Sequence, residues 1–463
     1  MPRAQSRLNF IPPAFNPIVL RLVHCSLPIL QRFRLLSWLP AGIKEIEVVN
    51  GITLVKLFHQ FQLGKIRLIL AFRHCEVDDP ISGLHLLSRA VPKIARQQDI
   101  KLKNPIHGHF MYDRGMTIWA GDWLGWLFAR MGGVPVHRGR TLDLQAIKQI
   151  RELLVSGRFP LVIAPEGATN GHSEIVSPLE PGAAQLAFWC AEDLAKANRV
   201  EEVIVVPINI QYHYPNPQWL KLDRLLSRLE ADCGLSQLVI DTSIKAAAEL
   251  YYSRLLRLAE YLISEMEGFY RDFYHYHLPL SQDVTSREEN LTLRLQRLLD
   301  VSLQTGESYF GLKPKGSIIE RCRRLEEAGW NYIYRQDKKE LKELSPLKRG
   351  LADTIAAEAE LRMLHMRLAE SFVAVTGTYI QGKPSFTRLA ETSLILFDAI
   401  ARIKGAKNPR RPRLGWRKST VTIGETIKIS DRLSTYQKNR QGAKQAVDRL
   451  TQDLYQALIE MII

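Results

Sequence analysis

The sequence predicts an α/β protein with a mainly parallel sheet flanked by helices and with a large all-helical insertion. In the first half of the chain, short apolar runs typical of buried strands alternate with segments of helical periodicity. From about Ile244 to Lys404 the strand signal nearly disappears and helical periodicity takes over. Strand signal then returns near the end of the chain, so the last residues can complete the sheet that the first half began.

The alternating part runs from Ile43 to about Gln211. Its predicted strands are Ile43–Val49, Ile66–Phe72, Gly108–Tyr112, Val134–His137, Leu161–Ala164 and Val203–Ile210. Its predicted helices are Gly51–Gln62, Ser82–Arg96, Gly121–Arg130, Leu142–Val155 and Gly182–Ala197. Strands separated by helices favour a parallel sheet, and uninterrupted apolar runs are typical of its central strands.

The helical part carries one aromatic-rich segment. The predicted helices are Ala246–Tyr274, Glu288–Leu303, Ser317–Tyr334, Leu351–Val373 and Phe386–Ile403. Seven aromatic residues interleave the first of them: Tyr251, Tyr252, Tyr261, Phe269, Tyr270, Phe273 and Tyr274. Such a stripe usually packs into a core, and a surface that faces lipid or a partner is the alternative.

A basic stretch precedes the returning strands. Ala401–Lys418 holds eight basic residues and no acidic one, and its two prolines indicate a linker. Strands at Ser419–Ile423 and Thr426–Ile429 and a helix at Ala443–Ile463 follow. We therefore expect an N-terminal segment (residues 1–42), an α/β domain (43–240), a helical insertion (241–408) and a returning strand and helix (409–463).

Composition and charge limit the class of protein. The 463 residues are 46% hydrophobic and 24% charged, which excludes disordered and collagen-like chains and suits two or three domains. The net charge of +15 calls for an acidic partner, which could be a lipid surface, nucleic acid or an acidic protein. The five cysteines are odd in number and lack metal-ligand spacing, which indicates a reduced, cytoplasmic chain.

The N-terminal segment is apolar and basic. We expect neither a secretory signal nor a transmembrane helix, because polar residues and a proline interrupt the best apolar run, Ile18–Leu39. The interrupting residues are Arg21, His24, Pro28, Gln31, Arg32 and Arg34. Such a segment can lie in a membrane interface or pack on the protein's own core, and the sequence leaves both interpretations open.

A histidine and a carboxylate follow the apolar run Ile66–Phe72. His74 stands just beyond the predicted strand, and Asp79 lies five residues further on. Sites in open α/β sheets form where strands end, so the two side chains can meet there. The carboxylate would hold one ring nitrogen while the other takes a proton from a substrate hydroxyl. On its own, a histidine followed five residues later by an aspartate also occurs often by chance.

Two further polar patches follow later strands. In Gly132–Arg140, glycines let backbone approach a ligand closely, and Arg138 offers planar donors for a phosphate. In Ala164–Asn170, Glu166 and Gly167 can line a polar headgroup pocket at the edge that carries His74. Taken singly, the first is equally typical of a solvated surface arginine and the second of an ordinary turn.

Together and in this order, the patches resemble the glycerolipid acyltransferases of the 1-acylglycerol-3-phosphate acyltransferase type. That family shows Asn-His-x4-Asp, Gly-x-x-Phe/Pro-Ile/Val-x-Arg, Pro-Glu-Gly-Thr-Arg-Ser and a strand with Val-Pro-Ile. The corresponding segments are Arg73–Asp79, Gly132–Arg138, Pro165–Asn170 and Val206–Ile208. Pro181–Ala184 resembles the Gly-Ala step that opens the family's next helix, and Thr420–Ile429 resembles its late Gly-Glu-Pro-Ile strand. The resemblance covers roughly half of the chain, and the helical region has no counterpart in it.

The resemblance implies an O-acyltransferase with a role for each patch. His74 would be the general base and Asp79 its orienting carboxylate. The substrate-binding residues would be Arg138 and Arg140 for the acceptor phosphate, with Glu166, Gly167 and Gly132 shaping the acceptor pocket. The acyl donor would be acyl-CoA or acyl carrier protein, with no cofactor, no metal and no acyl-enzyme on Cys75. The acceptor would be a lysophospholipid, most simply 1-acylglycerol-3-phosphate, met at an anionic membrane surface by a cytoplasmic, peripherally membrane-associated protein.

The sequence departs from the family pattern in the first and third motifs. Arg73 replaces the asparagine before the histidine, and Glu76 occupies the usual Ser/Thr region. Ala168-Thr169-Asn170 stands where the third motif has Thr-Arg-Ser, so the arginine expected at position 169 is missing. Either Arg138, Arg140 or Arg114 supplies the phosphate-binding charge alone, or the acceptor is a non-phosphorylated lipid alcohol. A non-catalytic lipid-binding protein on the same fold is a further alternative. Nucleic acid is not expected as a partner, because no helix-turn-helix, zinc or aromatic-platform signature surrounds the basic stretch.

Overall fold

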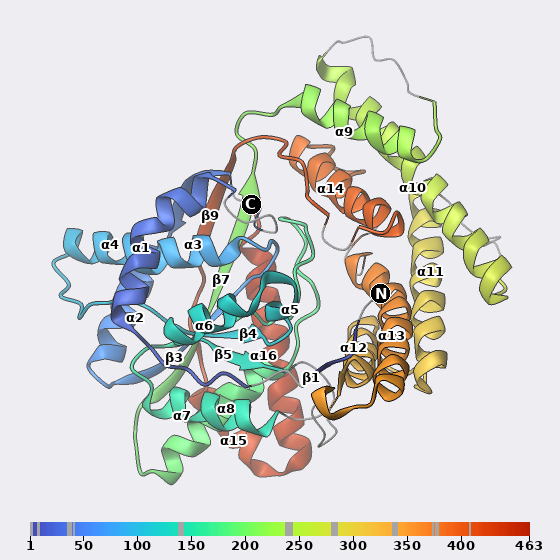
Figure 1. The fold of residues 1–463 in the computed structure, drawn as a ribbon. Coiled ribbons are helices and arrows are strands. Elements are labelled where there is room, and N and C mark those ends of the chain that lie inside the picture. Colours follow the sequence, from blue (N-terminus) through green and yellow to red (C-terminus); the bar gives the residue numbers. More distant parts are fainter. Residues whose placement is uncertain are drawn as a thin grey trace. The chain divides into compact units, whose positions relative to one another are not determined.

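The protein folds into two compact units, seen in a computed structural model (Figure 1). The structure describes residues 3–6, 10–34, 39, 42–137, 143–236, 244–278, 286–335, 341–372, 375, 379–406 and 409–463. An α/β unit contains Phe10–His137, Asp143–Asn216 and Gly415–Ile463. A helical unit is built mainly from Pro217–Leu414. Arg138 and Arg140, two of the predicted site residues, lie outside the described residues.

The α/β unit is organised around one mixed, mostly parallel sheet. In the described part of the chain it has eight strands, in the order β2-β9-β7-β3-β6-β4-β5, with β10 paired to β7. The strands are β2 (Ile43–Val49), β3 (Ile66–Phe72), β4 (His109–Asp113), β5 (Val134–Val136), β6 (Leu161–Ile163), β7 (Glu202–His213), β9 (Arg417–Ile423) and β10 (Ile427–Lys428). The pairs from β7 to β5 are parallel, and β9 runs antiparallel to β7. The predicted fold class, an α/β sheet with helices and a long helical region, is confirmed.

Strand β3 is central because its residues are apolar on both faces, apart from Arg67. All seven are buried, and its side chains alternate between two cores. Leu68 and Leu70 face the helices before and after β3, whereas Ile69 and Ala71 face later helices. The first layer holds α1 (Pro17–Arg32), α2 (Gly51–Gln62), α3 (Asp79–His85), a π-helical turn (Leu86–Ala90) and α4 (Val91–Gln97). The second holds α7 (Leu144–Ser156), α8 (Gly182–Lys196), α15 (Ser430–Lys438) and α16 (Arg440–Glu460).

Two short helices lie between β4 and β5. They are α5 (Met116–Ala120) and α6 (Asp122–Arg130).

The helix predicted to begin at Ser82 begins earlier, at Asp79, because Pro80 suits the first turn of a helix, where no amide donor is needed. In the described part of the chain, no helix is both long enough and apolar enough to cross a bilayer.

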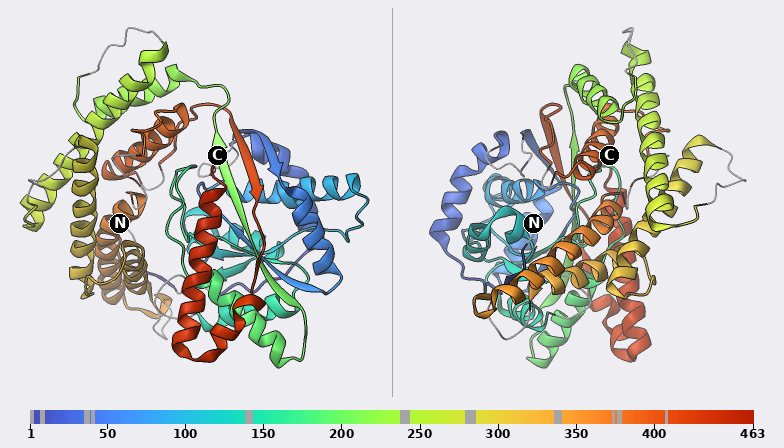
Figure 2. Two further views of the ribbon diagram at one scale, coloured as in Figure 1. Left: turned by 180° about the vertical axis from the view of Figure 1, so that it is seen from behind. Right: turned by 45° about the vertical axis from the view of Figure 1, so that its right-hand side comes forward.

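The returning strand β9 is inserted between β2 and β7. It pairs in parallel with β2, Ile46 opposite Ser419, and antiparallel with β7, Ile210 opposite Val421. Figure 2 shows β9 alongside β7, although more than two hundred residues separate them in the sequence. The basic stretch predicted to be a linker therefore ends inside the sheet: Arg417 is the first residue of β9 and is buried.

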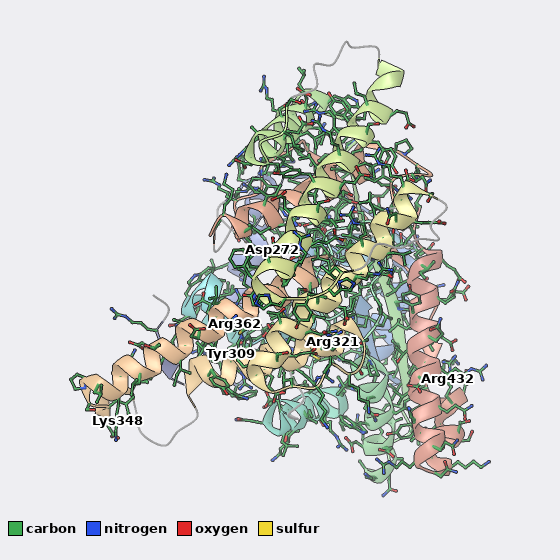
Figure 3. All side chains as sticks on the ribbon, turned by 90° about the vertical axis from the view of Figure 1, so that its right-hand side faces the viewer. Asp272, Tyr309, Arg321, Lys348, Arg362 and Arg432 are labelled. Atoms are coloured by element: carbon green, nitrogen blue, oxygen red, sulfur yellow. The ribbon has the colours of Figure 1, made fainter. Side chains whose placement is uncertain are left out.

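The helical unit packs long helices around a leucine- and alanine-rich core. It contains α9 (Trp219–Asp232), α10 (Ile244–Tyr274), α11 (Arg287–Phe310), α12 (Ile318–Ile333), α13 (Pro346–Phe372) and α14 (Phe386–Ile403), with a 3-10 turn at Leu341–Glu343 and the short parallel pair β1 (Gln5–Ser6) and β8 (Tyr334–Arg335). Figure 3 labels Tyr309, Arg321 and Arg362 on α11, α12 and α13, which pack on one another. Sequence reasoning missed α9, although its buried leucines recur with helical spacing.

The aromatic stripe of α10 divides between core and surface. Tyr251, Tyr252 and Tyr270 are buried, as core packing predicts, whereas Phe269 and Phe273 are exposed. The Tyr270 hydroxyl contacts Nδ1 of His365 at 2.7 Å, and burial lowers the pKa of His365 to about 4, so this buried histidine is neutral at pH 7.

A buried ion pair ties α9 to α10. The guanidinium of Arg254 donates to both carboxylate oxygens of Glu230, at 3.1 and 2.7 Å, and both side chains are fully buried. Arg254→Met should therefore destabilise the protein by about 3 kcal/mol, because the buried carboxylate of Glu230 would lose its bidentate partner and retain the hydrogen bond from Arg257 at 2.8 Å. Urea unfolding measures this loss. Adding Glu230→Met should recover most of it, and a loss below about 1 kcal/mol in the single variant would contradict the assignment.

Candidate active site

The loop that leaves β3 brings His74 and Asp79 together. Nδ1 of His74 lies 3.1 Å from Oδ2 of Asp79, and the same oxygen accepts the Glu76 backbone N–H at 2.9 Å. Asp79 is only 4% exposed, whereas the His74 side chain is 25% exposed. The carboxylate is thus fixed from two sides, and the imidazole it holds remains open to solvent.

This arrangement suits proton transfer. A carboxylate that accepts a hydrogen bond from Nδ1–H selects the tautomer in which Nε2 carries the lone pair. It also stabilises the imidazolium that forms when Nε2 takes up a proton. The geometry can therefore provide a general base for a hydroxyl group that approaches the exposed side of His74.

Glu166 connects the loop after β6 to the backbone of His74. Its Oε1 accepts the His74 N–H at 2.7 Å, and its Oε2 accepts the Ser177 N–H at 2.8 Å. The carboxylate is only 2% exposed; burial raises its pKa, and the nearby Arg73 guanidinium opposes that rise. Sequence analysis expected Glu166 to shape an acceptor pocket, and the structure turns both its oxygens toward protein donors.

Gly167 makes the turn beside this carboxylate. Its φ of +74° lies in the left-handed region, and a Cβ there would come within 2.2 Å of Oε1 of Glu180. The left-handed backbone favours glycine at this position, and any larger residue would also displace the Glu180 carboxylate.

Arg73 holds the same loop from the other side. It is fully buried, and its guanidinium donates to the backbone carbonyls of His172, Ser173 and Ile175 and to Oδ1 of Asn209. Arg73, the residue before His74, therefore organises residues 172–175. Its five donors suit a cluster of carbonyl oxygens, which a shorter side chain could not reach together.

The polar side chains near Thr169 are used internally. Nδ2 of Asn170 donates to Ile175 O at 2.8 Å and to Ser177 Oγ at 3.0 Å, and its Oδ1 accepts the His172 N–H. Arg114, one candidate for a phosphate-binding cation, forms an ion pair with Asp143, which also caps α7. Both Asn170 and Arg114 are therefore already engaged by groups of the protein.

Gly132 is not brought to His74. It precedes β5, and the parallel register places it beside His109 of β4 and in line with Ile69 of β3. His74 comes five residues after Ile69, beyond the end of β3. Its carbonyl accepts from Nδ1 of His109 at 3.0 Å, and a Cβ at Gly132 would lie 3.0 Å from that nitrogen. The close approach that this glycine permits is therefore to a histidine of the protein.

Cys75, the residue after His74, carries a buried thiol. Cys75 is fully buried with Sγ 3.4 Å from the Ile210 carbonyl, and burial raises the pKa of its thiol, which makes it a poor nucleophile. Among the described residues, no group of three side chains is arranged to hold a metal ion.

Sequence reasoning missed one charged residue of this region. Arg417 reaches from β9 into the loop and forms an ion pair with Asp78, the residue before Asp79. No local signal could have revealed it, because the contact depends on β9 joining the sheet next to β7.

Comparison with known families supports the resemblance at a coarse level. Residues 84–211 match the family model described as Acyltransferase, so the chain contains an acyltransferase family domain. The match includes Glu166 and Gly167 and begins after His74 and Asp79. A search of curated proteins found no match to this chain.

Replacing Glu166 tests whether its hydrogen bonds to the His74 and Ser177 backbone stabilise the protein. Glu166→Ala should lower the free energy of unfolding by about 2–4 kcal/mol, because the buried Ser177 N–H and the partly buried His74 N–H would lose their acceptor. Urea unfolding beside Glu152→Ala, an exposed glutamate of α7, gives the comparison. Equal free energies of unfolding for the two variants would show that the hydrogen bonds of Glu166 add no stability.

Proposed function

We propose that the acyltransferase domain moves a fatty acyl group from a thioester donor to the hydroxyl of a glycerolipid acceptor. The donor would be acyl-CoA or acyl carrier protein, and the +15 charge of the chain suits either anionic partner. The observation that carries the proposal is the 3.1 Å contact between Nδ1 of His74 and Oδ2 of Asp79, next to a segment that matches the acyltransferase family model.

The proposed reaction is a direct transfer. Nε2 of His74 takes the proton of the acceptor hydroxyl as its oxygen attacks the thioester carbonyl carbon. Asp79 keeps the imidazole oriented and stabilises its positive charge. When the tetrahedral intermediate collapses, the C–S bond breaks, the thiolate leaves, and the imidazolium returns the proton to it. The products are the ester and the free thiol, and no acyl group is attached to the protein.

The leading acceptor is 1-acylglycerol-3-phosphate. This choice of acceptor rests on the segment Gly132–Arg138, in which Arg138, with Arg140 nearby, would hold the phosphate. A non-phosphorylated lipid alcohol is the second candidate. Thr169 in place of the expected arginine favours it, as does the engagement of Arg114 with Asp143.

We also propose that helix α1 docks the protein on an anionic membrane surface. The helix contains no acidic residue, and one side of it exposes Ile18, Leu22, Ile29 and Phe33 next to arginines. Helix α6 packs against α1 and exposes two tryptophans. Apolar and aromatic side chains beside arginines are typical of helices that lie in a bilayer interface.

Replacing the proposed base tests the reaction. His74→Ala should lower kcat/KM by about 10²–10⁴-fold, because general-base assistance would be lost. Acyl transfer is measured from oleoyl-CoA and from acyl carrier protein, with lysophosphatidate, glycerol phosphate and a neutral lysolipid offered side by side.

His59→Ala, a partly exposed histidine of α2, is the matched control and should keep wild-type activity. Full activity of His74→Ala would refute the assignment of the base. Lipid binding by the wild-type protein without turnover of any acceptor would favour a binding protein on this fold.

The docking surface is tested with vesicles. Leu22→Asp should weaken cosedimentation with phosphatidylglycerol-containing vesicles about tenfold or more, because an apolar contact is replaced by a charge that the lipid repels. Leu144→Asp, an equally exposed leucine on α7, is the control and should bind like wild type. Similar losses in both variants, or none in Leu22→Asp, would contradict docking through α1.

A further inference from the structure

Asp78 is a buried carboxylate with an unusual set of contacts. It stands at the N-terminus of α3 but makes no capping hydrogen bond to that helix. Its Oδ2 receives the guanidinium of Arg417, whereas its Oδ1 is buried without a hydrogen bond from any residue that the structure describes. Burial raises the pKa of Asp78, and Arg417 acts in the opposite direction. The ionised form of this carboxylate thus depends strongly on Arg417.

Arg417 is held firmly in this position. It is the first residue of β9, and its backbone pairs with Ile43 of β2. The guanidinium carbon lies 4.7 Å from the ring centroid of Tyr212, so an aromatic face supports the cation while it points to Asp78. Arg417 also lies directly after the point where the chain returns from the helical unit.

The loop around His74 concentrates negative charge. Four carboxylates are buried there, those of Glu76, Asp78, Asp79 and Glu166, together with the hydroxyl of Tyr212 and the thiol of Cys75. Two buried cations, Arg73 and Arg417, face them. Arg73 is directed at the carbonyls of residues 172–175, so Arg417 is the cation in direct contact with Asp78.

Removing Arg417 would therefore act on Asp79 through its neighbour. Asp78 would then carry an uncompensated buried charge beside Asp79, move toward water, or take up a proton and become a hydrogen-bond donor. Each response changes the hydrogen bonding of the loop that places Asp79 3.1 Å from His74, and small misplacements of catalytic groups reduce turnover strongly.

We propose that Arg417 is a positioning residue that anchors Asp78 and thereby holds Asp79 in its contact with His74. The proposal rests on the acyl transfer proposed above. In this role Arg417 acts on the loop through Asp78, so its removal should lower turnover and leave substrate binding unchanged.

Kinetics of matched variants separate positioning from stability. Arg417→Met should lower kcat about tenfold with little change in KM, and Arg417→Lys should lower it less. Adding Asp78→Asn to Arg417→Met should restore most of kcat, because the buried charge that needs a partner is gone. Arg254→Met, which removes a buried arginine of the helical unit, should lose stability and keep kcat.

A spectroscopic readout decides the proposal independently of activity. The downfield proton resonance of His74 Nδ1–H reports the contact with Asp79; it should disappear in Arg417→Met and return in the double variant. An unchanged resonance, or a wild-type kcat in folded Arg417→Met, would overturn the role of Arg417. If the wild-type protein transfers no acyl group, the proposed function fails, and the resonance alone still decides whether Arg417 positions the pair. Should Arg417→Met fail to fold, the same readouts on Arg417→Lys and on the double variant decide.

Discussion

Burial of β3 on both faces is the constraint on which the site depends. Its side chains are shared between two cores, so the strand cannot slip along the sheet without moving every side chain to the wrong face. The point where β3 ends therefore fixes where the polar loop begins. His74 follows two residues after that end, and parallel β6 delivers Glu166 to the same edge.

The loop concentrates charge where water is largely excluded, and three of its four buried carboxylates have partners that explain why they are tolerated. Asp79 is held by an imidazole and a backbone amide, Glu166 by two backbone amides, and Asp78 by Arg417. Buried charges are stable only when paired or hydrogen-bonded in this way. The result is an imidazole held on one side by a rigid anionic frame and exposed on the other.

Much of this could be predicted from the sequence, and the rest depends on topology. Apolar runs and helical periodicity located β3 and most helices, and the spacing of His74 and Asp79 predicted their contact. The ion pair of Arg417 with Asp78 could not be predicted, because a basic stretch with two prolines resembles a linker until β9 is known to join the sheet. The position of Gly132 relative to His74 could not be predicted for a similar reason, because it follows from the strand register.

The central claim is that the acceptor hydroxyl, deprotonated by His74, takes the acyl group directly from the thioester donor. A single-turnover experiment with a labelled acyl thioester and the acceptor, quenched over time, tests it most directly. The account predicts that label passes to the lipid with none on the protein, and that His74→Ala transfers almost nothing. Label that accumulates on the protein before it reaches the lipid, or transfer by His74→Ala at the wild-type rate, would contradict it.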